Sequence, residues 1–311
     1  MKVLRLISAL SALIVLLVPL SSARVQAATH ILVALNDFDG YEAYVARDMG
    51  WFQRAGLDVE LQNFGSGAAV AAAVASQTAA IGVSNVITVA QAREHGLPFT
   101  FVAPASMAVS SSATAQFAVW PQGTIRSAKD LNGKTIGAET VTGLMRLASV
   151  AWIDRNGGDS TTVTFVEMSP GELVPALERG TIAAATLVEP LLTTDLPKVR
   201  ALGNPFDTFG PRVIVTGWFS TNGWISQNRA TATAFENVIE QAARWANDPK
   251  NKVQAAAYRM KYSPGHVEVG PTTYAVSWEP STIQPLLDAA TKYKLLTKPM
   301  TVDDLTFKAK G

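Results

Sequence analysis

The sequence predicts an α/β protein of two lobes, each a mostly parallel sheet flanked by helices, joined by a two-strand hinge. Three observations predict this class. Strand-like apolar runs alternate with helical stripes along residues 31–188, which is typical of open α/β sheets. Two segments repeat the same order of elements, and two extended apolar segments bracket the second unit. The 311 residues are enough for two ordinary domains, each with a sizeable core.

The first unit begins with a buried strand at 31–35, followed by a polar loop and a helix over 41–52. The apolar residues of that helix share one face, and Gly56 ends it. Further strands are predicted at 57–61, 80–83 and 99–103, and further helices at 68–75 and 86–95. This strand–helix order favours parallel strands with helical crossovers.

A second unit of the same kind begins near residue 122. It has predicted strands at 134–138, 163–166 and 183–188, a helix from Leu144 to Asn156 and another helix around 173–177. Residues 74–85 and 177–189 both run helix, turn, strand and polar end. We interpret this as two lobes built on one plan, with the strand ends at Ser84, Asn85 and Glu189 facing a common cleft. Two unrelated α/β units are the alternative.

The hinge is predicted from two extended apolar segments, 116–120 and 213–219, which we expect to pair as crossover strands. Helices follow around 235–245 and 283–290, so the first lobe is expected to be discontinuous. The expected division is a signal peptide at 1–27, a first lobe of 28–118 plus 215–311, and a second lobe of 119–214.

The first 27 residues have the order of a secretory signal peptide. A basic start with Lys2 and Arg5 precedes an apolar run over 6–20, and Val25 and Ala27 offer a cleavage site. A membrane anchor is the alternative, but the run is shorter than the ~20 residues that span a bilayer. A lipid anchor needs a cysteine, and the chain has none. We therefore predict an exported, soluble, periplasmic protein.

The charge balance excludes some partners. The chain has 26 basic and 25 acidic residues, a net charge of +1, which is too even for a nucleic-acid binder. Removing residues 1–27 takes away three bases and no acid, which leaves a net charge of −2. Any anion selectivity then has to come from helix ends and single side chains in the cleft.

Nothing in the sequence indicates catalysis or a cofactor. The absence of cysteine excludes thiolate metal sites and a cysteine nucleophile. The three histidines, His30, His95 and His266, are scattered without metal-ligand spacing. Residues 128–135 match a loose nucleotide-loop pattern but lead into a strand, whereas phosphate binding needs a following helix. We predict no metal, no cofactor and no catalytic residue.

Four stretches carry a resemblance to a known family. They are Gly40-Tyr41 with residues 45–60, residues 80–85, residues 130–137, and residues 176–180 leading to Glu189-Pro190. Together they resemble the nitrate/sulfonate/taurine-type solute-binding proteins of ABC importers, a group that includes a thiamine-pyrimidine-synthase branch. The resemblance covers about residues 31–219 and implies a type II periplasmic-binding-protein fold. The chain departs from the family at two places. Residues 77–80 lack the glycine and aspartate that the family commonly has there, and Ala183 stands where the family often has aspartate. These departures leave the identity of the ligand open.

The resemblance also implies which loops line the cleft. The expected lining residues are Asp39, Gly40, Tyr41, Gly65, Ser66, Gly67, Ser84, Asn85, Thr140, Thr142, Gly143, Arg146, Glu189 and Trp218. Among them Ser66, Ser84 and Thr142 each stand just before a predicted helix, where free amides and the helix dipole favour an anionic group. Ordinary helix caps are the alternative for each of the three.

Four side chains have sharper expected roles. Arg146 lies in the first turn of its predicted helix, where the dipole disfavours a cation and a bound carboxylate or sulfonate would offset that cost. Tyr41 and Trp218 are candidates to stack on a planar ligand. Glu189 is a candidate acceptor for a ligand N–H. Alternatively, Arg146 is a solvated surface side chain, Tyr41 and Trp218 are packed in the core, and Glu189 only caps the end of its strand.

We therefore expect the substrate-binding component of an ABC importer, without catalysis, whose lobes close over a small organic solute. The expected solute is an anion or zwitterion of the sulfonate, taurine or aromatic carboxylate type. A pyrimidine or thiamine-precursor heterocycle is the alternative solute. An enzyme of the pyrimidine-synthase branch is the alternative function, which the lack of cysteine disfavours. The expected partners are the solute and a membrane permease, with no nucleic acid, and the protein is expected to be a monomer.

Overall fold

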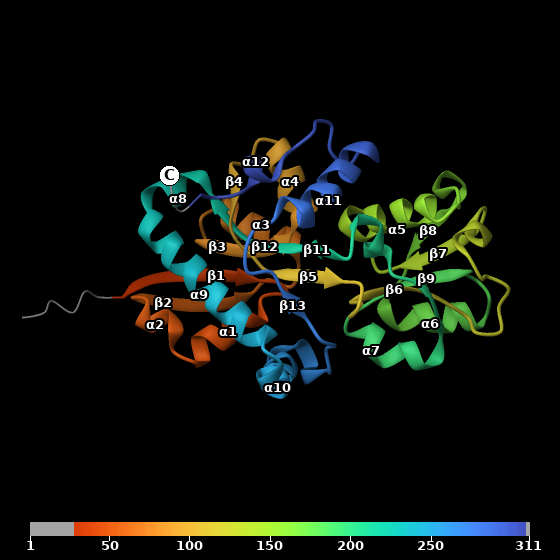
Figure 1. The fold of residues 1–311 in the computed structure, drawn as a ribbon, viewed down its shortest axis with the longest axis horizontal. Coiled ribbons are helices and arrows are strands. Elements are labelled where there is room, and N and C mark those ends of the chain that lie inside the picture. The colour runs from red at the N-terminus through yellow and green to blue at the C-terminus, as the bar shows by residue number, and fades with distance from the viewer. Residues whose placement is uncertain (1–27, 309–311) are drawn as a thin grey trace, which may run out of the picture.

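A computed structural model describes residues 28–308. It contains two five-stranded sheets, each flanked by helices, and a three-stranded sheet between them (Figure 1). We call the unit around the first five-stranded sheet the first lobe, on the left of Figure 1, and the unit around the second sheet the second lobe, on the right. The predicted α/β class with two lobes is therefore confirmed.

The first sheet has the strand order β2-β1-β3-β12-β4. Its strands are β1 (Thr29–Leu35), β2 (Leu57–Asn63), β3 (Ile81–Asn85), β4 (Phe99–Pro104) and β12 (Thr216–Thr221). Four of these strands point the same way, because β12 alone runs antiparallel to both of its neighbours. Since β12 comes from the C-terminal part of the chain, the first lobe is discontinuous.

Helices cover both faces of the first sheet. They are α1 (Tyr41–Asp48), α2 (Trp51–Arg54), α3 (Gly67–Ala75), α4 (Val86–Glu94), α8 (Asn222–Gln227), α9 (Arg229–Asn247), α10 (Lys252–Tyr262), α11 (Pro280–Lys292) and α12 (Val302–Leu305). Apolar residues of α1 and α9 pack on one face, and those of α3, α4 and α11 pack on the other. The predicted helix over 41–52 is two helices, because Gly50 adopts a left-handed φ of 68° that interrupts it.

The second sheet repeats the arrangement of the first. Its order is β10-β6-β9-β7-β8, from β6 (Ala115–Val119), β7 (Thr135–Ala138), β8 (Thr164–Glu167), β9 (Ala184–Val188) and β10 (Arg200–Gly203). In both sheets the strand next to one edge is antiparallel to the other four. The flanking helices are α5 (Gly143–Arg155), α6 (Pro170–Glu178) and α7 (Leu191–Asp195). β3 and β9 occupy equivalent places, so the predicted internal correspondence is confirmed.

The predicted pairing of the hinge strands is wrong. β6 lies inside the second sheet, between β9 and β10, and β12 lies inside the first. The crossover strands that pair are β5 (Ser106–Val109) and β11 (Arg212–Ile214), and β13 (Thr273–Tyr274) pairs on the other side of β5. A buried central strand has the same extended apolar pattern as a crossover strand, which explains the error. The lobe boundaries at 118/119 and 214/215 stay predictions.

The two lobes share part of one hydrophobic core. Buried residues of α5 in the second lobe, such as Leu147 and Ala148, pack in one cluster with residues of α4 and α11 in the first lobe. Two further clusters lie on the two faces of the second sheet. Within residues 28–308 no helix is long and apolar enough to cross a membrane. The predicted signal peptide lies outside the described residues.

Candidate functional site

A cavity of about 690 Å³ lies between the two lobes. Asn36 and Asn85 reach it from the carboxyl ends of β1 and β3, and Glu139 and Glu189 from those of β7 and β9. Its lining residues are Asn36, Asp37, Phe38, Asp39, Gly65, Ser66, Gly67, Asn85, Ser106, Met107, Thr114, Glu139, Thr140, Leu144, Met145, Pro170, Val188, Glu189, Pro190, Leu191, Phe206, Val215, Thr216, Val269 and Thr272. Ligands of open α/β sheets bind at this edge.

The first turns or caps of four helices also line the cavity. Ser66 caps α3 by accepting the Ala69 amide at 3.2 Å, and Asn85 caps α4 by accepting the Thr88 amide at 2.8 Å. The first turns of α5 and α6 contribute Leu144 and Pro170. Because the N-terminal ends of helices carry partial positive charge and free N–H groups, these surfaces can bind an acidic group.

Four carboxylates line the same cavity: Asp37, Asp39, Glu139 and Glu189. None of the described residues lining it is Lys, Arg or His. Burial raises the pKa of Asp39, against hydrogen bonds from Asn36, whose Nδ2 donates to Oδ2 at 2.7 Å, and from Ser106. Burial also raises the pKa of Glu139. The cavity therefore concentrates negative charge that has no basic side chain opposite it.

The hydroxyl groups of Ser106, at the start of β5, and Thr216, at the start of β12, complete the polar lining. The Ser106 and Thr216 oxygens lie 2.6 Å apart, and the Ser106 amide donates to Thr216 Oγ1 at 3.0 Å. Sequence reasoning missed both residues: it predicted no strand at 106–109, and from the predicted hinge segment 213–219 it named Trp218 but not Thr216. It also missed Asn36 and Glu139, which directly follow predicted strands and could have been found by that position. The apolar walls around Phe38, Met145 and Phe206 carry no comparable sequence signal.

Residues 38–252 match the family described as NMT1/THI5 like. This match spans more than half of the 311 residues. The chain belongs to the NMT1/THI5-like family. No curated protein is similar enough in sequence to match it.

The fold of this NMT1/THI5-like chain is that of periplasmic binding proteins of ABC importers. The aliphatic sulphonate binding protein SsuA of Escherichia coli has a TM-score of 0.70 at 14% identity, covering 90% of this chain and 92% of its own. A putative sulfonate-binding SsuA of Methylobacillus flagellatus has a TM-score of 0.71 at 15% identity, covering 91% of this chain and 92% of its own. The nitrate-binding protein NrtA of Synechocystis has a TM-score of 0.67 at 13% identity, covering 89% of this chain and 84% of its own.

Half of the predicted site residues line the cavity of this NMT1/THI5-like protein. They are Asp39, Gly65, Ser66, Gly67, Asn85, Thr140 and Glu189. Ser66 is a helix cap as predicted, but Ser84 is not: its side chain is fully buried against Gly67, and the next residue, Asn85, caps α4. Successive side chains of a strand point to opposite faces. An error of one residue therefore assigns a core side chain to the cavity, as happened with Ser84.

Gly40, Tyr41 and Trp218 lie in the core behind the cavity instead of in its wall. Trp218 has no exposed surface, and its Nε1 donates to Oε1 of Glu42 at 2.9 Å. Tyr41 is 3% exposed. A methyl group at position 40 would lie 2.9 Å from the Trp218 ring. The backbone φ of Gly40, 82°, also favours glycine. These two rings, expected to stack on a solute, are therefore not among the residues that line the cavity.

Thr142, Gly143 and Arg146 also lie outside the cavity. Thr142 precedes α5 without capping it, and its side chain is exposed. The Arg146 guanidinium lies over the Phe165 ring, 3.8 Å from its centroid, and desolvation lowers its pKa. A cation–π contact thus places this side chain on the β8 side of α5.

Glu42 is a buried carboxyl group beside this core. It is 1% exposed, and its second carboxylate oxygen, Oε2, has no hydrogen-bond partner among residues 28–308. Burial raises the pKa of Glu42 to about 7, against the hydrogen bond from Trp218. The folded protein therefore favours the protonated carboxyl group at a pH where the unfolded chain has already lost that proton.

This shift predicts that stability falls as the pH rises. Between pH 4.5 and about 7 the native state holds a proton on Glu42 that the unfolded state has released. The free energy of unfolding should therefore drop across this range, by about 3 kcal/mol from this group. Urea unfolding at pH 5 and pH 8 measures the drop, and Glu42→Gln should reduce it. An equal drop in wild type, Glu42→Gln and the surface control Glu178→Gln would contradict this assignment.

Proposed function

We propose that the chain is the solute-binding component of an ABC importer and that its solute is a small zwitterion bearing an amino group. The observation that carries this proposal is the set of four carboxylates in the cavity, with no Lys, Arg or His among the described residues that line it. A plain anion would meet this negative charge without a compensating cation. An ammonium group would neutralise part of it and would offset part of the cost of keeping the desolvated Asp39 ionised.

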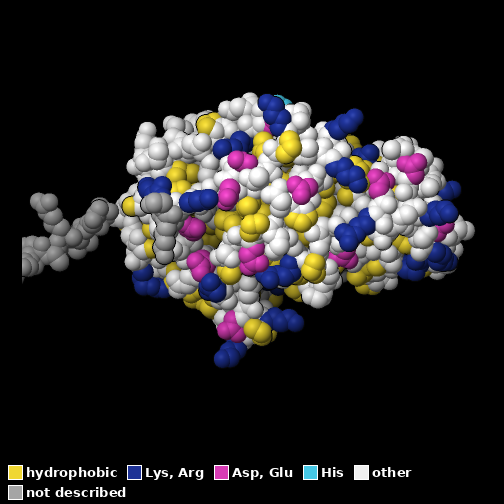
Figure 2. Space-filling view, turned by 45° about the horizontal axis from the view of Figure 1, so that its top comes forward, with side chains coloured by type: hydrophobic (Ala, Val, Ile, Leu, Met, Phe, Trp, Pro, Cys, Tyr) yellow, Lys and Arg dark blue, Asp and Glu magenta, His cyan; other side chains and the backbone are white. Residues whose placement is uncertain are grey.

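The helix ends supply the complementary half of the site. The cap of α3 at Gly65–Gly67 and the first turn of α5 face the same cavity, and both can bind an acidic group. A zwitterion can therefore place its acid at the helix ends and its ammonium at the carboxylates. Acidic and basic side chains are interspersed on the face shown in Figure 2, which favours selection by local contacts over selection by a net field.

An aminated heterocycle of the pyrimidine type is the second candidate. It is favoured by the apolar walls, where Phe38, Leu144, Met145 and Phe206 offer surfaces for a flat ring. Ring N–H and amino groups would donate to the same carboxylates. Both candidates share hydrogen-bond donors that a sulfonate or nitrate ion lacks.

We further infer a periplasmic location after removal of residues 1–27, a membrane permease as the partner and a monomeric state. The sulfonate and nitrate proteins with the same fold are named as periplasmic binding proteins, which supports the location. The Methylobacillus flagellatus protein is named as part of a sulfonate ABC transporter, which supports the partner. We propose no catalytic step, since the cavity groups described here suffice for binding and release.

The solute class can be tested with matched pairs of compounds. Taurine, β-alanine and an aminopyrimidine should raise the Tm of the exported protein. Ethanesulfonate, propionate and the pyrimidine without its amino group should not. At a hundredfold excess over Kd, binding stabilises the native state by about 2.7 kcal/mol, which is a shift of several degrees. Differential scanning fluorimetry followed by calorimetry measures both.

Two results would count against the proposal. Equal stabilisation by ethanesulfonate and taurine would show that the amino group is not recognised. If no compound of the panel, nor nitrate, changes the Tm, the binding of such small solutes is contradicted.

A further inference from the structure

Residues 267–272, which we call the strap, connect α10 to β13. Val269 and Thr272 of the strap line the cavity between the lobes. The strap ends at β13, where Thr273 and Tyr274 pair with Met107 and Ser106 of the crossover strand β5. It therefore belongs to the first lobe by its connections and runs along the side of that lobe that faces α7 in Figure 1.

The strap touches the second lobe at Gly270. A methyl group on Gly270 would lie 2.3 Å from Oε1 of Glu189 and 3.0 Å from Oγ1 of Thr193, so it fits only if the Glu189 carboxylate moves. The same Oε1 accepts a hydrogen bond from Thr193 Oγ1 at 3.0 Å. The Glu189 carboxylate is thus confined between the Thr193 hydroxyl and the strap backbone.

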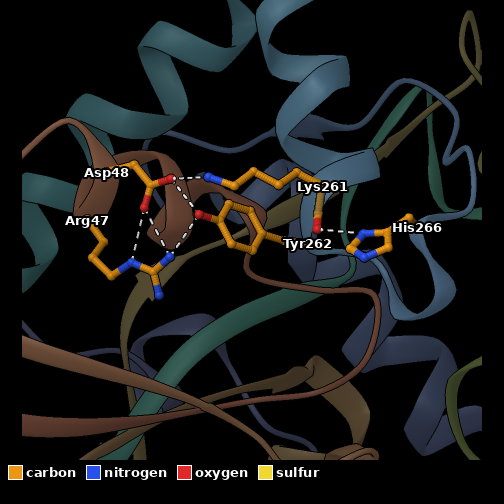
Figure 3. Close-up of polar contacts among 5 residues, drawn as sticks. All are labelled: Arg47, Asp48, Lys261, Tyr262 and His266. Carbon is orange, nitrogen blue, oxygen red and sulfur yellow. Dashed lines mark hydrogen bonds and ion pairs between the residues drawn. The ribbon is translucent and has the colours of Figure 1, made fainter.

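Hydrogen bonds fix the start of the strap to α10. The Ser263 hydroxyl donates to the Val267 carbonyl at 2.8 Å, and the Arg259 Nε donates to the Val269 carbonyl at 3.5 Å. His266 Nδ1 lies 3.0 Å from the Lys261 carbonyl oxygen (Figure 3). The strap therefore follows α10 in position.

A cluster around Asp48 fixes α10 in turn to α1 of the first lobe. Lys261 Nζ and Tyr262 Oη donate to Asp48 Oδ2 at 3.0 and 2.5 Å, and Arg47 bonds both Asp48 and Tyr262 (Figure 3). The Tyr44 and Tyr262 rings stack with centroids 4.1 Å apart. Because of this cluster, the strap moves with the first lobe, and opening of the cavity has to separate it from Glu189.

We propose that the strap is the closing edge of the solute cavity and that Gly270 is a positioning residue for the Glu189 carboxylate. The closure part depends only on the contact between the lobes. The positioning part rests on the proposed function, since it concerns the carboxylate that would receive an amino group. The two parts have separate measurements.

Closure is measured without any solute. The chain has no cysteine, so a spin-label pair at Gln53→Cys in the first lobe and Glu178→Cys in the second reports their distance cleanly. Adding Gly270→Ala should shift the distance distribution of the solute-free protein to longer values. Gly223→Ala in α8, where a methyl group meets nothing within 4 Å, should leave it unchanged. A Gly270→Ala distribution identical to that of Gly223→Ala overturns the strap as the closing edge.

Positioning is measured with taurine by calorimetry, with Tm measured for each variant. Gly270→Ala should weaken taurine binding at least tenfold, and Thr193→Val should weaken it in the same direction. Glu189→Asp shortens the carboxylate, so the double variant Gly270→Ala/Glu189→Asp should bind better than the sum of the two single losses predicts. Additive losses overturn the positioning role. If taurine fails to bind the wild type, the taurine proposal fails, and the distance measurement still decides the closure.

Discussion

Replacing Trp218 by alanine is expected to lower the free energy of unfolding by about 3–5 kcal/mol. The Trp218 side chain is fully buried, and its ring packs edge-on against Phe235 at 5.4 Å between centroids. Its removal leaves a cavity between β12 and α9, and it also removes the hydrogen bond that Trp218 Nε1 donates to the Glu42 carboxylate. Urea unfolding at pH 7, monitored by circular dichroism, measures the loss.

The control variant Trp218→Phe separates packing from the hydrogen bond. It keeps most of the ring and loses the Nε1 donor, so a loss of about 1–3 kcal/mol is expected from the unpartnered Glu42. In both variants the folded protein should bind its solute with unchanged affinity, because Trp218 does not line the cavity. A large loss of affinity with normal stability would instead place this ring in the site.

Replacing Asp39 by asparagine is expected to weaken an amine-bearing solute by about ten- to a hundredfold, which corresponds to one lost charge-assisted hydrogen bond. The same variant should be slightly more stable than wild type at pH 8 in the absence of solute. Burial raises the pKa of Asp39, so an ionised carboxylate at this position costs the native state free energy that a neutral amide avoids. Calorimetry with taurine and urea unfolding measure the two effects.

Asp58→Asn is the matched control, because Asp58 is an exposed carboxylate on β2 beside His30. It should leave taurine affinity unchanged. The opposite pattern for Asp39→Asn, lower stability with unchanged affinity, would indicate a structural aspartate and contradict the proposed ammonium site.

The sequence was sufficient for most strands of the two large sheets and for their order along the chain, because local patterns determine them. It did not predict the short strands β5, β10 and β13. Alternating strands and amphipathic helices predicted every strand of the first sheet within a few residues. The repeat of 74–85 in 177–189 predicted the equivalence of β3 and β9. Strand pairing depends on contacts between distant segments, and an apolar extended run does not reveal its neighbour. For this reason 116–120 and 213–219 were paired incorrectly.

The same distinction between local patterns and strand pairing applies to the candidate site. Residues at the ends of parallel strands, such as Asn85 and Glu189, could be placed, since those ends share one edge of a sheet. Trp218 could not, because its strand runs the other way. β12 is antiparallel to β3 with Thr216 opposite Asn85, so it begins at the cavity, and Trp218 lies two residues, about 7 Å, deeper in the lobe. Predicting this requires the strand order.

The place of β12 also determines the order in which the chain can fold. All five strands of the second sheet lie between residues 115 and 203, so that lobe is complete as soon as this stretch has been made. The first sheet has a gap between β3 and β4 until residues 216–221 arrive. A growing chain thus carries an unfinished N-terminal lobe, with two unpaired strand edges, until more than two thirds of it has been synthesised. Late completion of this sheet is compatible with the proposed export of the chain, since a polypeptide passes through an export channel unfolded.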